Sequence, residues 1–346
     1  MKRHFTFIFA LLAMLFAHAE TNGFEVKKLD FEARFAWNGQ WNDNKINDDK
    51  TGFKGQFIQM SFNAQIVKGL EFQYQQRFNR NTDETFWDAT DNLRLNWQIN
   101  KKWDISAGKQ CVLIGGYEYD YAPIDNYQYS EFCNQIACYQ LGFSAGFRPS
   151  KNDYLQFQVV NSPLREWAGN NSYAMNLFWS GKHGCWSALW SFNLLEHQHR
   201  KWMTYFVLGN RFEFGKWHLH VDYMNRANAH QTYLFDDCSV MTELGVKAHP
   251  ALKLLARYTY DVNHSGNQAD NLVVNGTEIH ATMLGLEAEP IKNYRDWCRI
   301  FGIVGYSWGT NANPNGVLSD KCLNVQVGLK LRADILEGIK KLRKKH

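Results

Sequence analysis

The sequence predicts an all-β fold, a 16-stranded antiparallel transmembrane β-barrel of an outer membrane. Apolar and polar residues alternate with a period of two along most of the chain, as in strands with one face toward lipid. Aromatic residues make up 15% of the chain, with 13 Trp, 16 Tyr and 24 Phe against only 6 Pro. Connections between the runs alternate between short and long, which is typical of a barrel with both termini on the periplasmic side.

The first 19 residues predict a cleaved export signal. Two basic residues are followed by an apolar core at 5–16 that is too short to span a bilayer, and residues 17–19 have the small-x-small pattern of a signal peptidase site. We therefore expect the mature chain to begin at Glu20 and to be exported to the outer membrane of a Gram-negative cell.

The remaining composition excludes several classes of protein. No run of about twenty apolar residues follows the signal, and the mean hydropathy is -0.47, so no transmembrane helix is expected. Loss of the two basic residues of the signal lowers the formal charge from +4 to +2. That balance is too even to indicate a nucleic-acid partner.

Sixteen alternating runs can be counted after the signal. They lie at residues 29–38, 58–66, 70–77, 92–99, 103–111, 137–148, 155–159, 173–179, 186–194, 206–214, 217–223, 240–248, 252–261, 282–288, 299–306 and 323–332. An even number of strands, each of roughly ten residues, pairs all backbone groups within lipid. The alternative is a secreted soluble protein of stacked β-sandwiches, whose turns need not sort into long and short at opposite ends. We expect the barrel to cover residues 20–333.

The long connection at 114–134 is the first candidate site. It joins the runs 103–111 and 137–148 and is rich in tyrosine and carboxylate residues. A connection of this length among regular hairpins is usually functional, and we expect it to narrow the barrel. The candidate constriction residues are Tyr117, Glu118, Tyr119, Asp120, Tyr121, Asp125, Tyr127, Tyr129 and Glu131.

Cations on the polar faces of the strands form the second candidate site. The candidate residues lining the lumen are Arg34, Arg77, Arg94, Arg148, Arg211, Lys247, Lys253, Arg257, Arg299 and Lys330, with Arg332 beside them. Cations outnumber anions on these faces, and rings of Arg or Lys select anions. The alternative is that many of these side chains pair with carboxylates across strands and only keep the interior wet.

A resemblance enters at the central region, in Gly108-Lys109-Gln110, Ile114-Gly115-Gly116, Pro123, Tyr129-Ser130 and the strand 139–143. There the chain resembles the phosphate-selective porin O and P family, in its shorter Bacteroidota-type forms. The resemblance implies a sixteen-stranded outer-membrane porin, often a homotrimer, with a water-filled channel for small hydrophilic solutes or anions. One departure is that residues 114–134 hold four carboxylates and no Lys or Arg, whereas the family's phosphate channels are lined by cations.

Neither the cysteines nor the histidines indicate a metal site. Seven scattered cysteines lack a CxxC pattern, although Cys133 and Cys138 could form a local bridge. His218 and His220 share an inward face, and His197 and His199 repeat the spacing in a connection, but no third ligand accompanies either pair. A structural role is favoured for all four, and no metal or cofactor is expected.

Two other functions were weighed against a channel. A barrel lipid hydrolase needs Ser and His at one depth of the lipid-facing wall, and neither that pair nor a GxSxG motif is present. We therefore expect no enzyme. A surface binding or adhesion barrel stays the second alternative and would require a closed lumen.

The basic tail at 334–346 is the other departure from the family, because the chain does not end on a strand-terminal aromatic residue. Ile335, Leu336, Ile339 and Leu342 recur at helical spacing before a run of Lys and Arg. The tail is expected to be either a short amphipathic periplasmic helix or a solvated, frayed segment, since short isolated helices are marginal in water.

Overall fold

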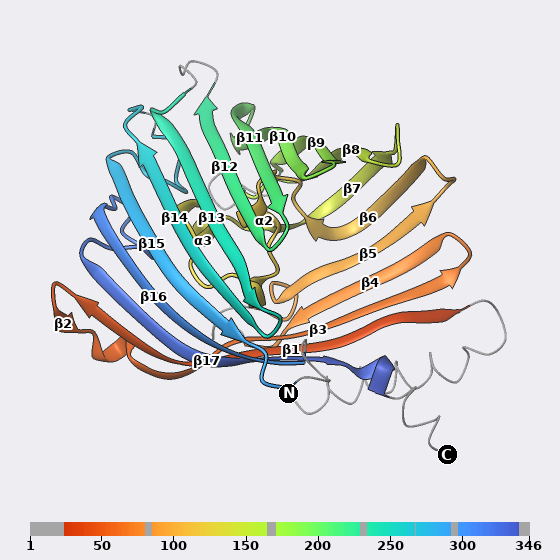
Figure 1. The fold of residues 1–346 in the computed structure, drawn as a ribbon. Coiled ribbons are helices and arrows are strands. Elements are labelled where there is room, and N and C mark those ends of the chain that lie inside the picture. Colours follow the sequence, from red (N-terminus) through yellow and green to blue (C-terminus); the bar gives the residue numbers. More distant parts are fainter. Residues whose placement is uncertain are drawn as a thin grey trace.

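The computed structural model describes residues 24–79, 85–164, 171–228, 234–266, 268–291 and 297–338. These residues form one antiparallel sheet that curls into a barrel (Figure 1). Strand β1 pairs with β3 on one side and with β17 on the other, so the sheet closes on itself. The sheet has seventeen strands in the described chain; β2 spans only 2 residues, which leaves sixteen in the wall. The predicted sixteen-stranded antiparallel barrel is confirmed.

The strands follow one another around the barrel in chain order. Their bounds are β1 Glu25–Asn42, β2 Lys45–Ile46, β3 Gly52–Val67, β4 Leu70–Arg77, β5 Thr90–Gln98, β6 Trp103–Cys111, β7 Tyr139–Phe147, β8 Asp153–Asn161, β9 Tyr173–His183, β10 Trp186–Gln198, β11 Lys201–Phe214, β12 Trp217–Asn228, β13 Asp237–His249, β14 Leu252–Asn263, β15 Thr277–Ala288, β16 Cys298–Thr310 and β17 Cys322–Asp334. Short helices are the 3-10 helices η1 Asp48–Lys50 and η2 Pro123–Asp125 and the α-helices α2 Tyr117–Asp120 and α3 Glu131–Gln135.

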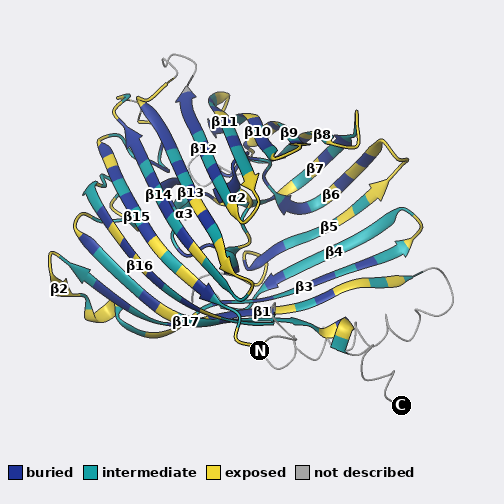
Figure 2. Cartoon of the chain, viewed as in Figure 1, coloured by how far each residue is buried: buried dark blue, intermediate teal, exposed yellow. Residues whose placement is uncertain are grey.

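The period of two in the sequence appears as alternating burial along the strands (Figure 2). On β7, Leu141 and Phe143 are 49% and 54% exposed on the outside, whereas Gln140 and Ser144 are 6% and 3% exposed on the inside. Successive side chains of a strand point to opposite faces, so one face meets lipid and the other meets the lumen. None of the helices in the described ranges is long and apolar enough to cross a membrane.

One predicted connection is wrong. The sequence predicted a long loop at 196–201, but β10 continues to Gln198 and β11 begins at Lys201, and these two residues are register partners. Arg200 takes a left-handed φ of 59°, which lets His199 and Arg200 close a tight hairpin. The polar residues there continue the backbone pairing of β10 with β11, because this pairing does not depend on alternating apolar side chains.

The predicted bridge between Cys133 and Cys138 is also wrong, since both are free thiols. Cys133 belongs to α3, where its N–H bonds to Ser130 Oγ at 3.2 Å. Cys138 follows the helix, and its carbonyl accepts the N–H of Val112 at 2.8 Å. Backbone hydrogen bonds therefore hold Cys133 in the helix and Cys138 in the extended segment.

The ends of the chain are described only in part. The predicted signal at 1–19 lies outside the described residues. Residues 335–338 are helical, and Leu336 packs with Leu29, Phe62 and Ala64. Residues 339–346 also lie outside the described residues, so the amphipathic helix stays a prediction for the tail.

Labelling of single cysteines tests the orientation of the barrel. In a background without the seven native thiols, we expect a membrane-impermeant maleimide on intact cells to label Asp49→Cys and not Lys216→Cys. Asp49 lies in η1 at the long-loop end, and Lys216 lies in the two-residue turn between β11 and β12. Labelling of Lys216→Cys on intact cells would show that the barrel is inserted the other way round.

Candidate functional site

The connection between β6 and β7, residues 112–138, folds into the barrel, where Figure 1 shows α2 and α3 inside the ring of strands. Its first part is held by backbone N–H groups. Gly115 donates to Ser191 Oγ at 2.9 Å, and Gly116 donates to the carbonyl of Leu189 at 3.0 Å. Glu118 then donates to Asp222 Oδ2 at 2.8 Å. We call residues 112–138 the inner loop.

The Gly115-Gly116 pair allows the inner loop to lie directly on the wall. A Cβ atom at Gly115 would lie 2.6 Å from the carbonyl oxygen of Leu189. A Cβ atom at Gly209 on β11 would lie 2.6 Å from the Cα of Gly116. Side chains at these positions would separate loop and wall, so glycine is required at each.

An apolar core joins the inner loop to β8–β12. Phe132 of α3 packs edge-on against Tyr205 of β11, with ring centroids 5.8 Å apart. The same core includes Val207 and, from the connection after β14, Leu272 and Val273. The sequence analysis missed these residues. The signal was that β11 is apolar on both faces, which is typical of a strand buried on both sides.

Two arginines bind the middle of the inner loop. Arg34 Nη1 donates to the carbonyls of Ile124 and Asn126, at 3.1 and 2.6 Å. Arg257 Nη1 donates to the carbonyl of Gln128 at 2.6 Å and to the side chain of Asn126. Both guanidinium groups are buried, so carbonyl oxygens supply the polar partners that water would otherwise supply.

Arg257 also belongs to a buried charge network. It pairs with Glu243 at 2.5 Å, and Tyr121 donates its hydroxyl to the same carboxylate at 2.6 Å. The Tyr121 hydroxyl is also 2.6 Å from His220 Nδ1, and His218 lies 3.4 Å from Glu243. His220 therefore contacts the inner loop, and His218 contacts the charge network. No group of three or more potential metal ligands occurs in the described part of the chain.

Asp125 attracts cations from the last strands. Its carboxylate lies 2.8 Å from Lys330 Nζ, 3.5 Å from Arg299 Nη1 and 3.6 Å from Arg332 Nη2. Burial raises the pKa of Asp125, but the three cations outweigh burial and leave that pKa below its ordinary value. Asp125 therefore stays ionised and ties the loop to this wall.

Two other loop carboxylates, Glu118 and Glu131, accept hydrogen bonds within the protein. Glu118 accepts the N–H and hydroxyl of Ser130 at 2.6 and 2.8 Å, and both residues are buried. Glu131 Oε2 accepts the N–H groups of Val317 and Leu318 at 3.1 and 3.0 Å. The candidate constriction residues divide into three groups by their exposure. Tyr117, Glu118, Tyr127 and Glu131 are buried, Tyr119, Tyr121, Asp125 and Tyr129 are partly exposed, and Asp120 is exposed.

Most of the candidate lumen cations have carboxylate partners, as the alternative interpretation required. The carboxylate pairs are Arg77 with Asp91, Arg148 with Asp104, Arg211 with Glu213, Arg257 with Glu243, Arg299 with Asp125 and Glu289, Lys330 with Asp125 and Glu287, and Arg332 with Glu32 and Asp125. Within the described ranges, Arg34, Arg94, Lys247 and Lys253 have no carboxylate at ion-pair distance. Arg94 instead donates through Nε to Gln73 Oε1 at 2.9 Å.

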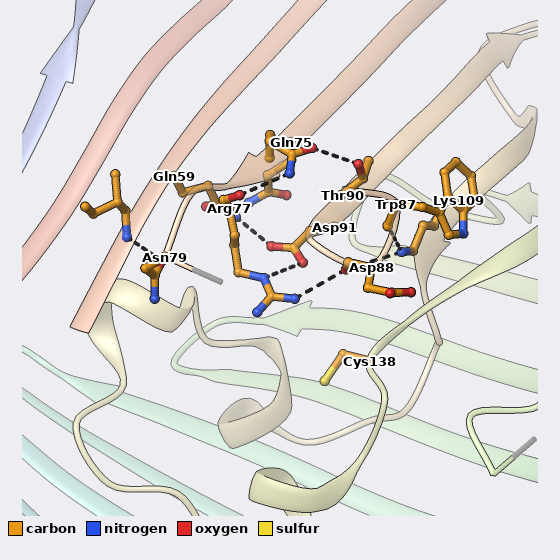
Figure 3. A network of polar contacts seen from close by, with 12 residues as sticks. Gln59, Gln75, Arg77, Asn79, Trp87, Asp88, Thr90, Asp91, Lys109 and Cys138 are labelled. Atoms are coloured by element: carbon orange, nitrogen blue, oxygen red, sulfur yellow. Dashed lines mark hydrogen bonds and ion pairs between the residues drawn. The ribbon is translucent and has the colours of Figure 1, made fainter. Parts of the chain in front are cut away.

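The wall of β3–β8 differs from the wall that holds the inner loop. Figure 3 shows a chain of side chains on it, in which Gln75 donates to Gln59 at 2.7 Å and Gln59 donates to Asp91 at 2.8 Å. Arg77 Nε completes the chain at 2.8 Å from Asp91. Amide side chains predominate here, so this wall is polar with few unpaired charges.

Comparison with known proteins agrees with this architecture. The sequence model of the phosphate-selective porin O and P family matches residues 28–186. The chain is an outer-membrane channel. The matched part holds the inner loop and the wall of β3–β8, the same region in which the sequence resembled the family. No curated protein sequence matches the chain.

Several solved porin structures share the fold. An anion-selective porin from Comamonas acidovorans superposes with a TM-score of 0.63 at 11% identity, covering 90% of this chain and 100% of that chain. The outer membrane channel DcaP of Acinetobacter baumannii gives 0.61 at 11% identity, with 90% and 98% covered. The trimer form of OmpT from Vibrio cholerae gives 0.57 at 12% identity, with 90% and 100% covered. At such identities the likeness concerns the fold alone.

Replacement of Arg257 tests the anchoring of the inner loop in this porin-type barrel. Arg257→Ala leaves Glu243 buried without its cation and removes two bonds to the loop, a loss of about 3–5 kcal/mol for a buried pair. We expect faster amide hydrogen exchange across 112–138. The control is Arg94→Ala, whose side chain does not bond to the loop. Equal exchange in both variants would show that Arg257 does not hold the loop.

Proposed function

We propose that this channel passes small hydrophilic solutes by passive diffusion between the inner loop and the wall of β3–β8. The observation that supports this proposal is the position of the inner loop against one side of the lumen. Apart from Leu113, which bonds to Gln158 of β8, the polar anchors of the loop described above lie on β1, on β10–β17 or in the connection between β16 and β17. The loop therefore covers one side of the lumen and leaves the β3–β8 side to the solute.

We infer that the inner loop sets the aperture through the residues it does not bury. Asp120 is exposed and Tyr121 is partly exposed at the turn between α2 and η2. Their opposite wall holds Arg77, Arg94 and Arg148, of which Arg77 and Arg148 are ion-paired. Arg94 is thus the cation on that wall with the most influence on a passing ion, which supports a modest preference for anions.

The proposal extends to the assembly and its surroundings. The outward faces of the strands carry large exposed apolar side chains such as Leu141, Phe143 and Leu177, which supports contact with outer-membrane lipid. We infer that the protein is a homotrimer and that it belongs to the shorter Bacteroidota-type porins. We also infer that residues 1–19 direct export and are then cleaved. Support for the trimer is the likeness in fold to a protein solved as a trimer. We also propose that the protein works without a cofactor and is not an enzyme.

Removal of the loop tests its role in setting the aperture. Replacement of residues 117–129 by a short Gly-Ser linker removes α2, η2 and the anchors to Arg34 and Arg257. We expect a higher single-channel conductance in planar bilayers, because the lumen is then wider. The control replaces residues 43–49, for which the described residues show no hydrogen bond or ion pair with the inner loop, and heat-modifiability on gels checks that each variant folds. Unchanged conductance without 117–129 would place the constriction in another segment.

Replacement of Arg94 tests the charge preference. One unit charge acting on an ion about 8 Å away in water changes its energy by about 0.5 kcal/mol, which is a factor of about two in an equilibrium. We expect Arg94→Gln to lower the anion-to-cation permeability ratio by about twofold, measured from reversal potentials in a salt gradient. Arg211→Gln removes the same charge from a pair with Glu213 near the barrel end and should change the ratio less. Equal effects would exclude a special role for Arg94.

A further inference from the structure

A cavity of about 240 Å³ lies between the inner loop and the strands β1, β16 and β17, on the side of the loop away from the proposed solute path. Five amide side chains line it, namely Gln40, Gln128, Asn134, Asn324 and Gln326. Lys50 is the one charged residue in the described lining. The cavity is slightly smaller than ordinary ligand pockets of about 300–1,000 Å³, so it suits a small solute.

Several of the amides have hydrogen-bonding capacity to spare. Asn324 Oδ1 is buried and has no hydrogen-bond partner among the described residues. The side-chain amide of Gln128 forms no hydrogen bond with the described residues, and it lies against Gly305, where a Cβ atom would be only 2.5 Å from Gln128 Oε1. Gln326 is positioned by Gln56, whose Nε2 donates to Gln326 Oε1 at 2.9 Å. Glycine at 305 therefore makes room for an amide that points at no protein partner.

The lining also has an aromatic and apolar part. Tyr129 lines the cavity, and no described aromatic ring stacks on it. Ile303 and Leu318 supply apolar surface nearby. Tyr127 differs, because its ring packs on Phe301 at 4.7 Å and its hydroxyl bonds to Glu287. The ring of Tyr306, which also lines the cavity, stacks on Trp308 at 6.0 Å, so Tyr129 is the lining ring that remains for a ligand.

We propose that this cavity binds a neutral polyhydroxylated solute of about monosaccharide size, which deepens and rests on the proposed channel function. A side-chain amide offers two donors and one acceptor, and a hydroxyl group likewise donates and accepts. A vicinal diol therefore uses both ends of an amide, whereas an anion uses only its donors and a cation only its acceptor. The ring of Tyr129 and the apolar residues face the C–H surface of such a ligand.

Titration with D-glucose tests the site in the full-length protein. Calorimetry records the heat as D-glucose is added to the detergent-folded protein, with polyethylene glycol 200, which has no vicinal hydroxyl groups, as the comparison. We expect D-glucose to give heat that saturates and polyethylene glycol 200 to give only its heat of dilution. The double variant Gln128→Leu, Asn324→Leu should raise the half-saturating concentration at least about tenfold, because two amide partners are lost.

The matched control is Gln198→Leu, an exposed amide in the β10–β11 hairpin outside the lumen, which should keep the D-glucose affinity of the parent. Equal, non-saturating heats for D-glucose and polyethylene glycol 200 would overturn the sugar site while leaving the channel in place. Equal D-glucose affinity of the double variant and the parent would overturn the assignment to this cavity.

Calorimetry separates this site from the channel function. Titration of D-glucose into the detergent-folded protein measures binding without requiring conductance, and heat-modifiability shows that the double variant is folded. Calorimetric binding that the double variant loses supports the site even if no conductance is seen, which would count against the proposed channel alone. If titration of D-glucose into the folded parent protein gives no heat of binding, the sugar site is overturned, whether or not the protein conducts ions.

Discussion

The structure depends on one constraint, that backbone N–H and C=O groups within lipid must bond to each other. An open sheet would leave one strand edge unpaired on each side, at several kcal/mol for each unsatisfied group. The pairing of β1 with β17, from Asp30 opposite Asp334 to Asn42 opposite Cys322, removes both edges. Closure forces half of all strand side chains inward, so the lumen and everything built in it follow from that pairing.

The lumen is divided by how its charges are satisfied. On the β10–β17 side and β1, the inner loop supplies carbonyl oxygens to Arg34 and Arg257, and Glu243 of β13 supplies a carboxylate to Arg257. On the β3–β8 side, amides such as Gln59 and Gln75 keep the surface polar without adding net charge. On the path that we propose, a solute meets a wall rich in amides opposite the inner loop, and Arg94 on that wall has no carboxylate at ion-pair distance among the described residues.

Much of the fold was predictable from the sequence because the period of two acts locally. Each residue of β7 from Tyr139 to Phe147 faces the side that its hydrophobicity indicates. The prediction was wrong at the hairpin of His199 and Arg200, where strands continue beyond the membrane and no hydrophobic contrast marks their ends. The sequence also gave no prediction for Tyr205 and Val207. Their apolar side chains face inward because the inner loop packs against them.

The sequence by itself determined the class of the barrel, the number of wall strands and the identity of the long loop, because each depends on spacing along the chain. Only the tertiary structure decided which charges are free. Asp125 and Lys330, 205 residues apart, lie at 2.8 Å, and no local pattern encodes that distance. The folding of the loop brings carboxylates and cations together through space, so pairing, burial and the amide-lined cavity arise from contacts between segments that are remote in sequence.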